Sequence, residues 1–328
     1  MDILLSKIRE FYGLRLCVVE KVSGGYLSQN YILSDGTVKY FFKKYRFDNE
    51  RRVKEVHAAK KYFFDSGIPV IVPLPGKSGK TYFECGGRYY AIFPFVCGLH
   101  MKYGAPKDGE IISYGEMLGR LHLVGKKSVL SIGSYFKPMD REESLRKIAK
   151  LIKKIHENEV SSDFDKTALE SLSLKKELIA TNDIQYDQLG LKNDHLIHGD
   201  YLYHNVFFND SLKVSHVFDF EKTAYYPRCF EIFRSMFYSF PIEGNGPLSL
   251  PYAKLYLDSY SRAYPISNEE IRNGLRMLYL HNIYSLWIES EHYLWGNRRI
   301  DLFLIPEKQR IEYLSKHKKE LEEFFSSN

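Results

Sequence analysis

Cysteine is scarce in this sequence, and its four residues are far apart. No C-x-x-C pair occurs among Cys17, Cys85, Cys97 and Cys229, so the sequence lacks the ligand spacing of a structural zinc site. The spacing indicates no disulfides either. This cysteine usage is typical of the reducing cytoplasm, and we expect a cytoplasmic protein.

Long apolar runs and ordered basic motifs are also absent. No apolar run reaches the roughly 20 residues of a membrane-spanning helix, and residues 1–13 lack the basic-then-apolar order of a signal peptide. The formal net charge is +6, but the lysines are scattered, and no basic motif with interleaved aromatic residues indicates a nucleic-acid-binding module. We expect no membrane and no nucleic acid as a partner, and a monomer or homodimer.

Aromatic residues are abundant instead, at 15% of the 328 residues. Stacking surfaces would explain such an excess, but a core rich in tyrosine and phenylalanine explains it more simply. The composition is that of a globular protein. The length is sufficient for two domains or one large domain with a substantial core.

Residues 1–96 alternate short strand patterns with turn signals. Runs rich in aromatic and β-branched residues predict five strands. These strands are expected at residues 18–22, 30–33, 39–45, 80–85 and 89–95. One helix over residues 49–65 interrupts them, because apolar residues between Val53 and Phe63 recur at helical spacing and Gly67 follows.

After residue 98 the pattern becomes mainly helical. Helices are expected at residues 111–123, 141–156, 166–180, 228–240, 251–264, 268–295 and 307–325. One non-helical segment, residues 196–220, stands between them. There, the apolar runs 205–208 and 214–220 flank Asn209-Asp210 and predict a hairpin.

The clearest chemical pattern lies in this non-helical segment. His198-Gly199-Asp200 is followed by Asn205, five residues after the aspartate, and the second apolar run leads into Asp219-Phe220-Glu221. This order resembles the catalytic and metal-binding motifs of the aminoglycoside phosphotransferase and choline kinase superfamily, H-G-D-x-x-x-x-N followed by a hydrophobic strand that ends in D-F-E or D-W-E. The resemblance covers most of the chain and is sharpest at these two motifs.

The resemblance implies an α+β, two-lobed protein-kinase-like fold. Residues 1–96 would form a small, nucleotide-binding N-lobe with an antiparallel β-sheet and one helix. Residues 97–328 would form a large, mainly helical C-lobe with the catalytic loop, the metal site and the acceptor subdomain. The implied cofactor is Mg²⁺, with ATP or GTP as co-substrate, and the partners are this nucleoside triphosphate and a small-molecule acceptor.

Phosphoryl transfer explains the residue types, since it depends mainly on positioning and charge neutralisation. We expect Asp200 to orient the acceptor hydroxyl and to take its proton as a general base. Asn205 and Asp219 carry the oxygen atoms that Mg²⁺ prefers, so we expect them to hold the metal. His198 would brace the loop through backbone hydrogen bonds. Leu202 stands where protein kinases usually have a lysine, which is similar to the small-molecule branch of the fold.

The nucleotide contacts are expected in the N-lobe. In the family, a lysine on the third strand contacts the α- and β-phosphates, and a helix glutamate orients it. Lys43 fits the family pattern of aromatic residues before the lysine, and strand alternation places Lys44 on the other face. Glu55 lies twelve residues before Gly67, near the family's spacing, and Glu50 is the alternative partner.

Two further segments are expected at the nucleotide. Residues 23–30 occupy the place of the phosphate-covering loop, where glycine permits close backbone approach, although they lack a full G-x-G-x-x-G and would alone be an ordinary turn. Residues 91–98 correspond to the hinge that meets the nucleobase, or simply to a buried edge strand. The residues expected to contact the nucleotide are Ser23, Gly24, Gly25 and Ser28 in the loop, and Phe95 and Val96 in the hinge.

The acceptor is expected at acidic and aromatic residues of the C-lobe. These residues are Glu221, Glu231, Tyr284, Trp287 and Glu291. Such side chains suit a cationic amino alcohol or aminosugar. An ion pair of Glu231 with Arg228 or Arg234 is the structural alternative, as is a plain amphipathic helix over residues 268–295.

These patterns predict a kinase that transfers the γ-phosphoryl group of ATP or GTP to a hydroxyl group of a metabolite or an aminoglycoside-like acceptor. One alternative is a Ser/Thr protein kinase of the bacterial stress-response type. Another is a non-catalytic, nucleotide-binding pseudokinase or spore-coat-like protein. The complete set of Asp200, Asn205 and Asp219 argues against a loss of catalysis.

Overall fold

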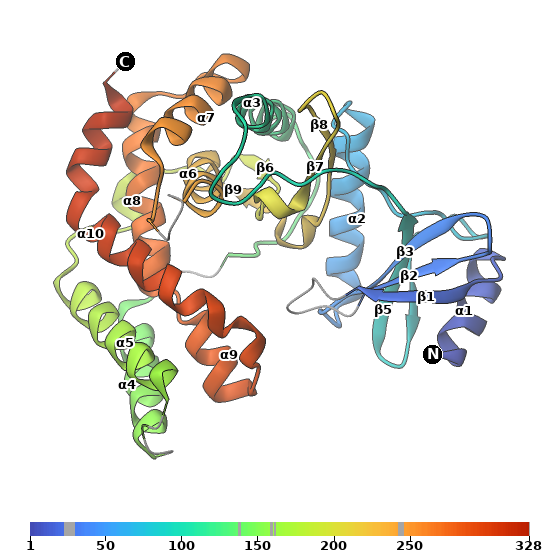
Figure 1. Ribbon diagram of the computed structural model, residues 1–328, viewed down its shortest axis with the longest axis horizontal. Coiled ribbons are helices and arrows are strands. Elements are labelled where there is room, and N and C mark those ends of the chain that lie inside the picture. The colour runs from blue at the N-terminus through green and yellow to red at the C-terminus, as the bar shows by residue number, and fades with distance from the viewer. Residues whose placement is uncertain (23–29, 137–138, 158–159, 161, 242–245, 328) are drawn as a thin grey trace. The chain divides into compact units, whose positions relative to one another are not determined.

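The computed structural model describes residues 1–328 apart from 23–29, 137–138, 158–159, 161, 242–245 and 328 (Figure 1). The described residues form two compact units. The first unit comprises residues 1–101, 120–135 and 195–225, and the second comprises residues 102–119, 136–194 and 226–328. No helix within the described ranges is long and apolar enough to cross a bilayer.

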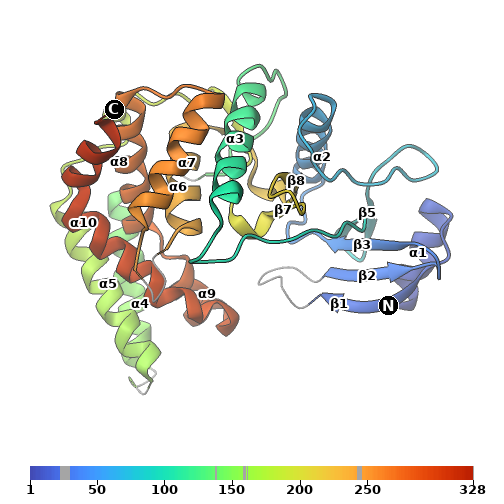
Figure 2. The same cartoon turned by 45° about the horizontal axis from the view of Figure 1, so that its top comes forward.

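A five-stranded antiparallel sheet in the order β1-β2-β3-β5-β4 begins the first unit (Figure 2). Its strands are β1 (Cys17–Val22), β2 (Asn30–Ser34), β3 (Lys39–Lys44), β4 (Phe83–Cys85) and β5 (Arg88–Pro94). All five predicted strands are confirmed, although β4 begins at Phe83 and not at residue 80. Lys43 pairs with Asn30 on one side and with Ala91 on the other, so it lies on the central strand.

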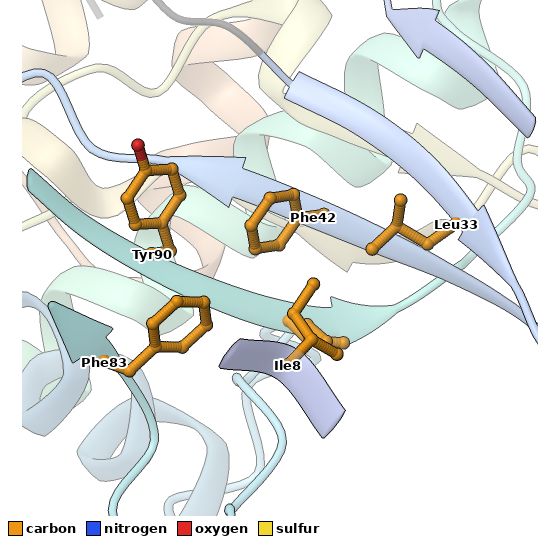
Figure 3. Packing of buried hydrophobic residues seen from close by; sticks show 6 residues of the cluster. Ile8, Leu33, Phe42, Phe83 and Tyr90 are labelled. Carbon is orange, nitrogen blue, oxygen red and sulfur yellow. The ribbon is translucent and has the colours of Figure 1, made fainter. Parts of the chain in front are cut away.

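Helix α1 (Asp2–Tyr12), which the sequence patterns did not predict, contributes to the core beside this sheet. The core cluster contains Ile8, Leu33, Phe42, Phe83, Tyr90 and Ile92 (Figure 3). The rings of Phe42 and Tyr90 stack with their centroids 5.4 Å apart. Ile8 reaches this cluster from α1 and is fully buried. The aromatic excess of the sequence therefore serves the core here.

Helix α2 (Glu50–Asp65) confirms the helix predicted over residues 49–65. Asn49 caps its N-terminus, because the Asn49 side chain accepts a hydrogen bond from the backbone N–H of Arg51 at 2.9 Å. Beyond its C-terminus, Gly67 has a φ of 79°, a left-handed conformation that glycine adopts without strain. The buried apolar face consists of Val53, Val56, Ala59 and Phe63.

The segment with the sequence motifs contains the short strands β6 (His195–Ile197), β7 (Val206–Phe208), β8 (Val214–Val217) and β9 (Ala224–Tyr226). Strands β7 and β8 form the predicted hairpin, and β6 pairs with β9. Asn209 shapes the hairpin turn, because its side chain accepts hydrogen bonds from the backbone N–H groups of Ser211 and Lys213. Strand β8 ends before residue 220, since Asp219 takes a φ of 66° that a strand cannot accommodate.

Helices dominate the rest of the chain. They are α3 (Asp108–Gly125), α4 (Arg141–Glu157), α5 (Asp163–Thr181), α6 (Arg228–Ser239), α7 (Leu250–Ala263), α8 (Asn268–Tyr284), α9 (Trp287–Trp295) and α10 (Leu304–Ser326). Figure 1 shows α4 beside α5, and α8 beside α10. Capping boxes at Ser162 and Ser267 begin α5 and α8. The expected α+β class, with an antiparallel N-terminal sheet and a mostly helical remainder, is confirmed.

The single helix predicted over residues 268–295 is wrong, because α8 and α9 are separate. Ser285 leaves the helix in an extended conformation with a ψ of 121°, and serine is only a moderate helix former. The change of direction buries Leu286 at the start of α9. Residues before and after this break therefore do not share one helical face.

A buried ion cluster joins three helices of the second unit. Lys175 on α5 lies 2.9 Å from a carboxylate oxygen of Glu289 on α9 and 2.7 Å from one of Glu307 on α10. All three side chains are buried. Removal of one partner would leave an uncompensated buried charge, so the cluster fixes how these helices pack.

The docking of α1 through Ile8 can be tested with a matched pair of variants. Ile8→Ala should lower the free energy of unfolding by about 2–5 kcal/mol, because it removes a fully buried side chain and leaves a cavity. Ile3→Ala changes the same residue type on the same helix where 74% of the residue surface is exposed, and should cost less than about 0.5 kcal/mol. Urea denaturation measures both. Equal losses would contradict this packing.

Candidate active site

The loop that carries Asp200 is held in place by His198. His198 is fully buried, and its Nδ1 atom accepts a hydrogen bond from the backbone N–H of Asp200 at 3.1 Å. The other ring nitrogen, Nε2, therefore carries the proton and donates to the carbonyl oxygen of Phe218 at 2.8 Å. This imidazole ties the loop to the residue before Asp219, as the sequence analysis expected.

Asn205 holds the other backbone group of Asp200. The Asn205 side-chain Nδ2 donates to the carbonyl oxygen of Asp200 at 2.9 Å. The Asn205 carbonyl oxygen accepts a hydrogen bond from the N–H of Phe218 at 3.1 Å, which places this loop at the mouth of the β7–β8 hairpin. Because the amide nitrogen of Asn205 already has a partner, the amide oxygen is the atom suited to a cation.

The contact with Lys43 favours the ionised form of Asp219. One carboxylate oxygen of Asp219 lies 2.7 Å from the Nζ atom of Lys43. Burial alone would raise the pKa of Asp219, but the attraction and hydrogen bond of Lys43 outweigh it and lower the pKa to about 2. The choice of Lys43 over Lys44 is consistent with this contact. The ion pair joins β3 to the motif segment, 176 positions along the chain.

Glu221 is the second carboxylate at Lys43. Its Oε1 atom lies 2.8 Å from the Nζ atom of Lys43, and its Oε2 atom lies 3.1 Å from the Nε atom of Arg46. Arg46 also donates a hydrogen bond to the hydroxyl group of Tyr135 at 2.7 Å. Burial by itself would lower the pKa of Lys43, but its two carboxylate partners raise it, so the lysine stays charged.

The ion pair expected between Lys43 and Glu55 is not formed. Glu55 instead lies 2.9 Å from Nε of Arg51 and 3.2 Å from Nη1 of Arg52. These arginines precede it by four and three positions on α2, a spacing that brings side chains together on one helix face. Glu221, in the 3₁₀ turn after β8, takes the position at Lys43 that the spacing rule assigned to Glu55.

Arg52 fastens the turn that carries Glu221. Its Nη2 atom donates to the carbonyl oxygens of Glu221 at 2.8 Å and of Thr223 at 2.6 Å. The hydroxyl group of Thr223 in turn donates to the carbonyl oxygen of Ile197 on β6 at 2.7 Å. Helix α2 and strand β6 thus fix the backbone on both sides of Lys222.

Lys222 lies at Asp200, and the sequence analysis did not single it out. Its Nζ atom is 3.1 Å from the Oδ1 atom of Asp200. The one sequence signal was its place directly after the D-F-E motif. Within the described ranges, no group of three or more histidine, cysteine, aspartate or glutamate side chains is arranged to hold a metal ion. A metal at this site would therefore depend on Asp219 together with the amide oxygen of Asn205.

The other residues expected at the nucleotide are only partly described. Ser23, Gly24, Gly25 and Ser28 lie outside the described residues. Phe95 and Val96 follow β5 and are half-buried. The Nζ atom of Lys39 lies 5.8 Å from the centroid of the Phe95 ring. A contact of this segment with a nucleobase stays a prediction.

Four of the five residues expected at the acceptor belong to the second unit, and only Glu221 belongs to the first. The four are Glu231, Tyr284, Trp287 and Glu291. Trp287 exposes 37% of its surface, and a carboxylate oxygen of Glu291 accepts a hydrogen bond from the side-chain amide of Asn297 at 2.8 Å. Arg228, one of the two arginines considered as a partner of Glu231, lies 2.7 Å from a carboxylate oxygen of Glu270. An acceptor role for these side chains stays a prediction.

Comparisons with known proteins agree with this fold and these motifs. A model of the phosphotransferase enzyme family matches residues 18–266. A homoserine kinase of Caulobacter vibrioides (strain NA1000 / CB15N) is 28% identical over 258 residues, which cover 75% of this chain and 73% of that enzyme.

Solved structures of small-molecule kinases share the fold. The microcompartment-associated aminopropanol kinase superposes with a TM-score of 0.66 at 13% identity, over 98% of this chain and 100% of that chain. Spectinomycin phosphotransferase, in complex with ADP and spectinomycin, gives 0.62 at 13% identity over 99% and 98%. Choline kinase from Cryptosporidium parvum Iowa II gives 0.56 at 13% identity over 99% of each chain. The protein-kinase-like fold implied by the motifs is thus confirmed.

Because Glu221 and not Glu55 contacts Lys43, replacement of each glutamate by glutamine should affect Mg²⁺ dependence differently. Glu221→Gln removes a negative charge close to Asp219 and leaves Lys43 to Asp219 alone, and both effects weaken attraction of a cation to Asp219. We expect the Mg²⁺ concentration for half-maximal nucleotide binding to rise about tenfold, or about 1.4 kcal/mol. Calorimetric titrations at several Mg²⁺ concentrations measure this value.

Glu55→Gln is the control, since Glu55 binds two arginines of its own helix. Its Mg²⁺ dependence should stay within about twofold of the wild type. A larger shift in Glu55→Gln than in Glu221→Gln would show that the expected helix glutamate is the one that matters.

Proposed function

Because the chain belongs to the phosphotransferase enzyme family, we propose that it transfers the γ-phosphoryl group of ATP or GTP to a hydroxyl group of a small metabolite through Asp200, Asn205 and Asp219. The chain is a small-molecule kinase. The observation that carries the proposed site is the 2.7 Å contact between Lys43 and Asp219, since it unites the expected phosphate-binding strand with the expected metal-binding motif.

Asp200 is the proposed general base. In the transfer, the acceptor oxygen bonds to the γ-phosphorus, the bond from this phosphorus to the bridging oxygen breaks, and the diphosphate leaves with that electron pair. The hydroxyl proton passes to the Asp200 carboxylate. The fixed backbone supports this role, because His198 and Asn205 bind the N–H and the carbonyl oxygen of Asp200. Such rigidity favours catalysis by positioning.

Asn205 and Asp219 are the residues that would hold Mg²⁺. Both offer oxygen atoms, the hard ligands that this ion prefers. The hydrogen bond from the Asn205 amide nitrogen to Asp200 leaves the oxygen as the donor atom for a metal, and the low pKa of Asp219 keeps its carboxylate ionised. When bound, the ion would neutralise charge on the β- and γ-phosphates. Lys43, held between Asp219 and Glu221, would bind the phosphates beside it.

The proposed acceptor class is a hydroxyl-bearing amino acid or amino alcohol. The homoserine kinase relative supports this class, since its match spans most of both chains. Sugars, aminosugars and aminoglycosides are the acceptors to test against it.

The assigned roles predict distinct defects in two variants. Asp200→Asn should lower kcat by about 10²–10⁴-fold while nucleotide binding persists, because the variant keeps the shape but loses the base. Asp219→Ala should abolish Mg²⁺-dependent turnover with circular dichroism unchanged. A spectrophotometric assay of ADP or GDP release measures both. Wild-type kcat in Asp200→Asn would remove this residue from the role of base.

The acceptor class can be tested with a pair of compounds that differ by one hydroxyl group. Homoserine should stimulate ADP or GDP release, and 2-aminobutyrate, which lacks that hydroxyl, should not. A panel of amino alcohols, sugars, aminoglycosides and proteins completes the assay. Stimulation by protein acceptors alone, or by no acceptor at all, would contradict the proposed class.

A further inference from the structure

A cation from outside the catalytic loop lies beside the proposed base. The Nζ atom of Lys222 lies 3.1 Å from the Oδ1 atom of Asp200. The position two residues after the base is occupied by Leu202, whose side chain is buried and carries no charge. Protein kinases usually place a lysine at that position, so here a lysine from a different segment lies beside the same carboxylate.

The chain holds Lys222 at this place by close backbone packing. Gly199 has a φ of 83°, and a Cβ atom on it would lie 2.2 Å from the carbonyl oxygen of Lys222. Only glycine therefore permits the loop before Asp200 to approach the turn that carries Lys222. Arg52 binds the carbonyl oxygens on either side, at Glu221 and Thr223.

The side chain of Lys222 combines this fixed backbone with access to solvent. It exposes 27% of its surface, whereas that of Asp200 exposes 16%. The ammonium group can therefore keep its contact with Asp200 and still reach a group that enters from the solvent side. By contrast, Lys43 exposes only 11% and already has Asp219 and Glu221 as partners.

The contact of Lys222 with Asp200 would reduce the charge repulsion between Asp200 and the nucleotide. Asp200 and a nucleoside triphosphate are both anionic, yet the acceptor hydroxyl must lie between the carboxylate and the γ-phosphoryl group. A cation shared by the two anions lowers their repulsion, and it gains attraction as charge develops on the transferred group.

We propose that Lys222 is a catalytic residue whose ammonium group contacts the transferred γ-phosphoryl group while it holds Asp200. This inference rests on the proposed function, in which Asp200 is the base. The acceptor oxygen bonds to the γ-phosphorus, the bond to the bridging oxygen breaks with its electron pair on the diphosphate, and the hydroxyl proton goes to Asp200. Lys222 keeps its own proton throughout and contributes only charge and hydrogen bonds.

The test compares three variants in the full-length protein. Lys222→Met keeps the length of the side chain without the charge, and should lower kcat about 10²-fold, with the KM values for nucleotide and acceptor within about threefold. The kcat of Lys222→Arg should be at least tenfold higher than that of Lys222→Met. Lys213→Met removes an exposed lysine from the turn of the nearby β7–β8 hairpin, and should leave kcat unchanged. Thermal unfolding midpoints should match in all three.

A binding measurement supplies a readout that does not depend on turnover. Fluoroaluminate with Mg²⁺ and ADP imitates the phosphoryl group in transfer, so it should bind wild-type protein more tightly than Mg²⁺ and ADP alone. In Lys222→Met, the increase in affinity caused by fluoroaluminate should be about tenfold smaller, while the affinity for Mg²⁺ and ADP alone should match the wild type. A purely structural lysine would leave the gain unchanged.

The outcomes separate this inference from the proposed function. If Asp200→Asn is inactive but Lys222→Met keeps kcat within threefold of the wild type and retains the fluoroaluminate gain, Lys222 has no catalytic role and the base assignment stands. If Asp200→Asn is fully active, both proposals fail. A lower thermal midpoint in Lys222→Met that accounts for the lost activity would also overturn the inference.

Discussion

The ion pair between Lys43 and Asp219 is the contact on which the candidate site depends. It joins the central strand of the sheet to Asp219, the second residue after β8, across 2.7 Å. It also keeps the Asp219 carboxylate ionised, since the attraction of Lys43 outweighs the effect of burial on its pKa. Glu221 shares the same lysine. Lys43 thus lies between two carboxylates. When a divalent cation and a triphosphate bind, the cation would become the partner of Asp219 and the triphosphate the partner of Lys43.

Side chains without a proposed reactive role fix the backbone around this pair. His198 bridges the N–H of Asp200 and the carbonyl oxygen of Phe218, so the two motifs cannot separate without loss of a buried hydrogen bond. Arg52 clamps the turn of Glu221 in a similar way. Phosphoryl transfer gains little from covalent chemistry and much from fixed geometry, which explains why so many of these contacts are made to backbone atoms.

Local patterns in the sequence predicted the strands, α2 and the hairpin, because these depend on periodicity and turn residues close in the chain. The hairpin register pairs Val206 with Val217, which brings the two motifs together. Where several side chains compete for one partner, the sequence did not predict which contact forms. Glu55 has suitable spacing for Lys43 but finds arginines on its own helix. Lys222 belongs to no motif, and no Pro or Gly marks the helix break at Ser285, where the following leucine is buried.

The most direct test of the site is a crystal structure with Mg²⁺ and a non-hydrolysable nucleoside triphosphate. The account predicts that oxygen atoms of Asn205 and Asp219 coordinate the ion at about 2.0–2.1 Å. Lys43 should then contact a phosphate oxygen while it keeps Glu221 as its partner. A metal–triphosphate complex bound elsewhere, with neither Asn205 nor Asp219 as a ligand, would contradict the account.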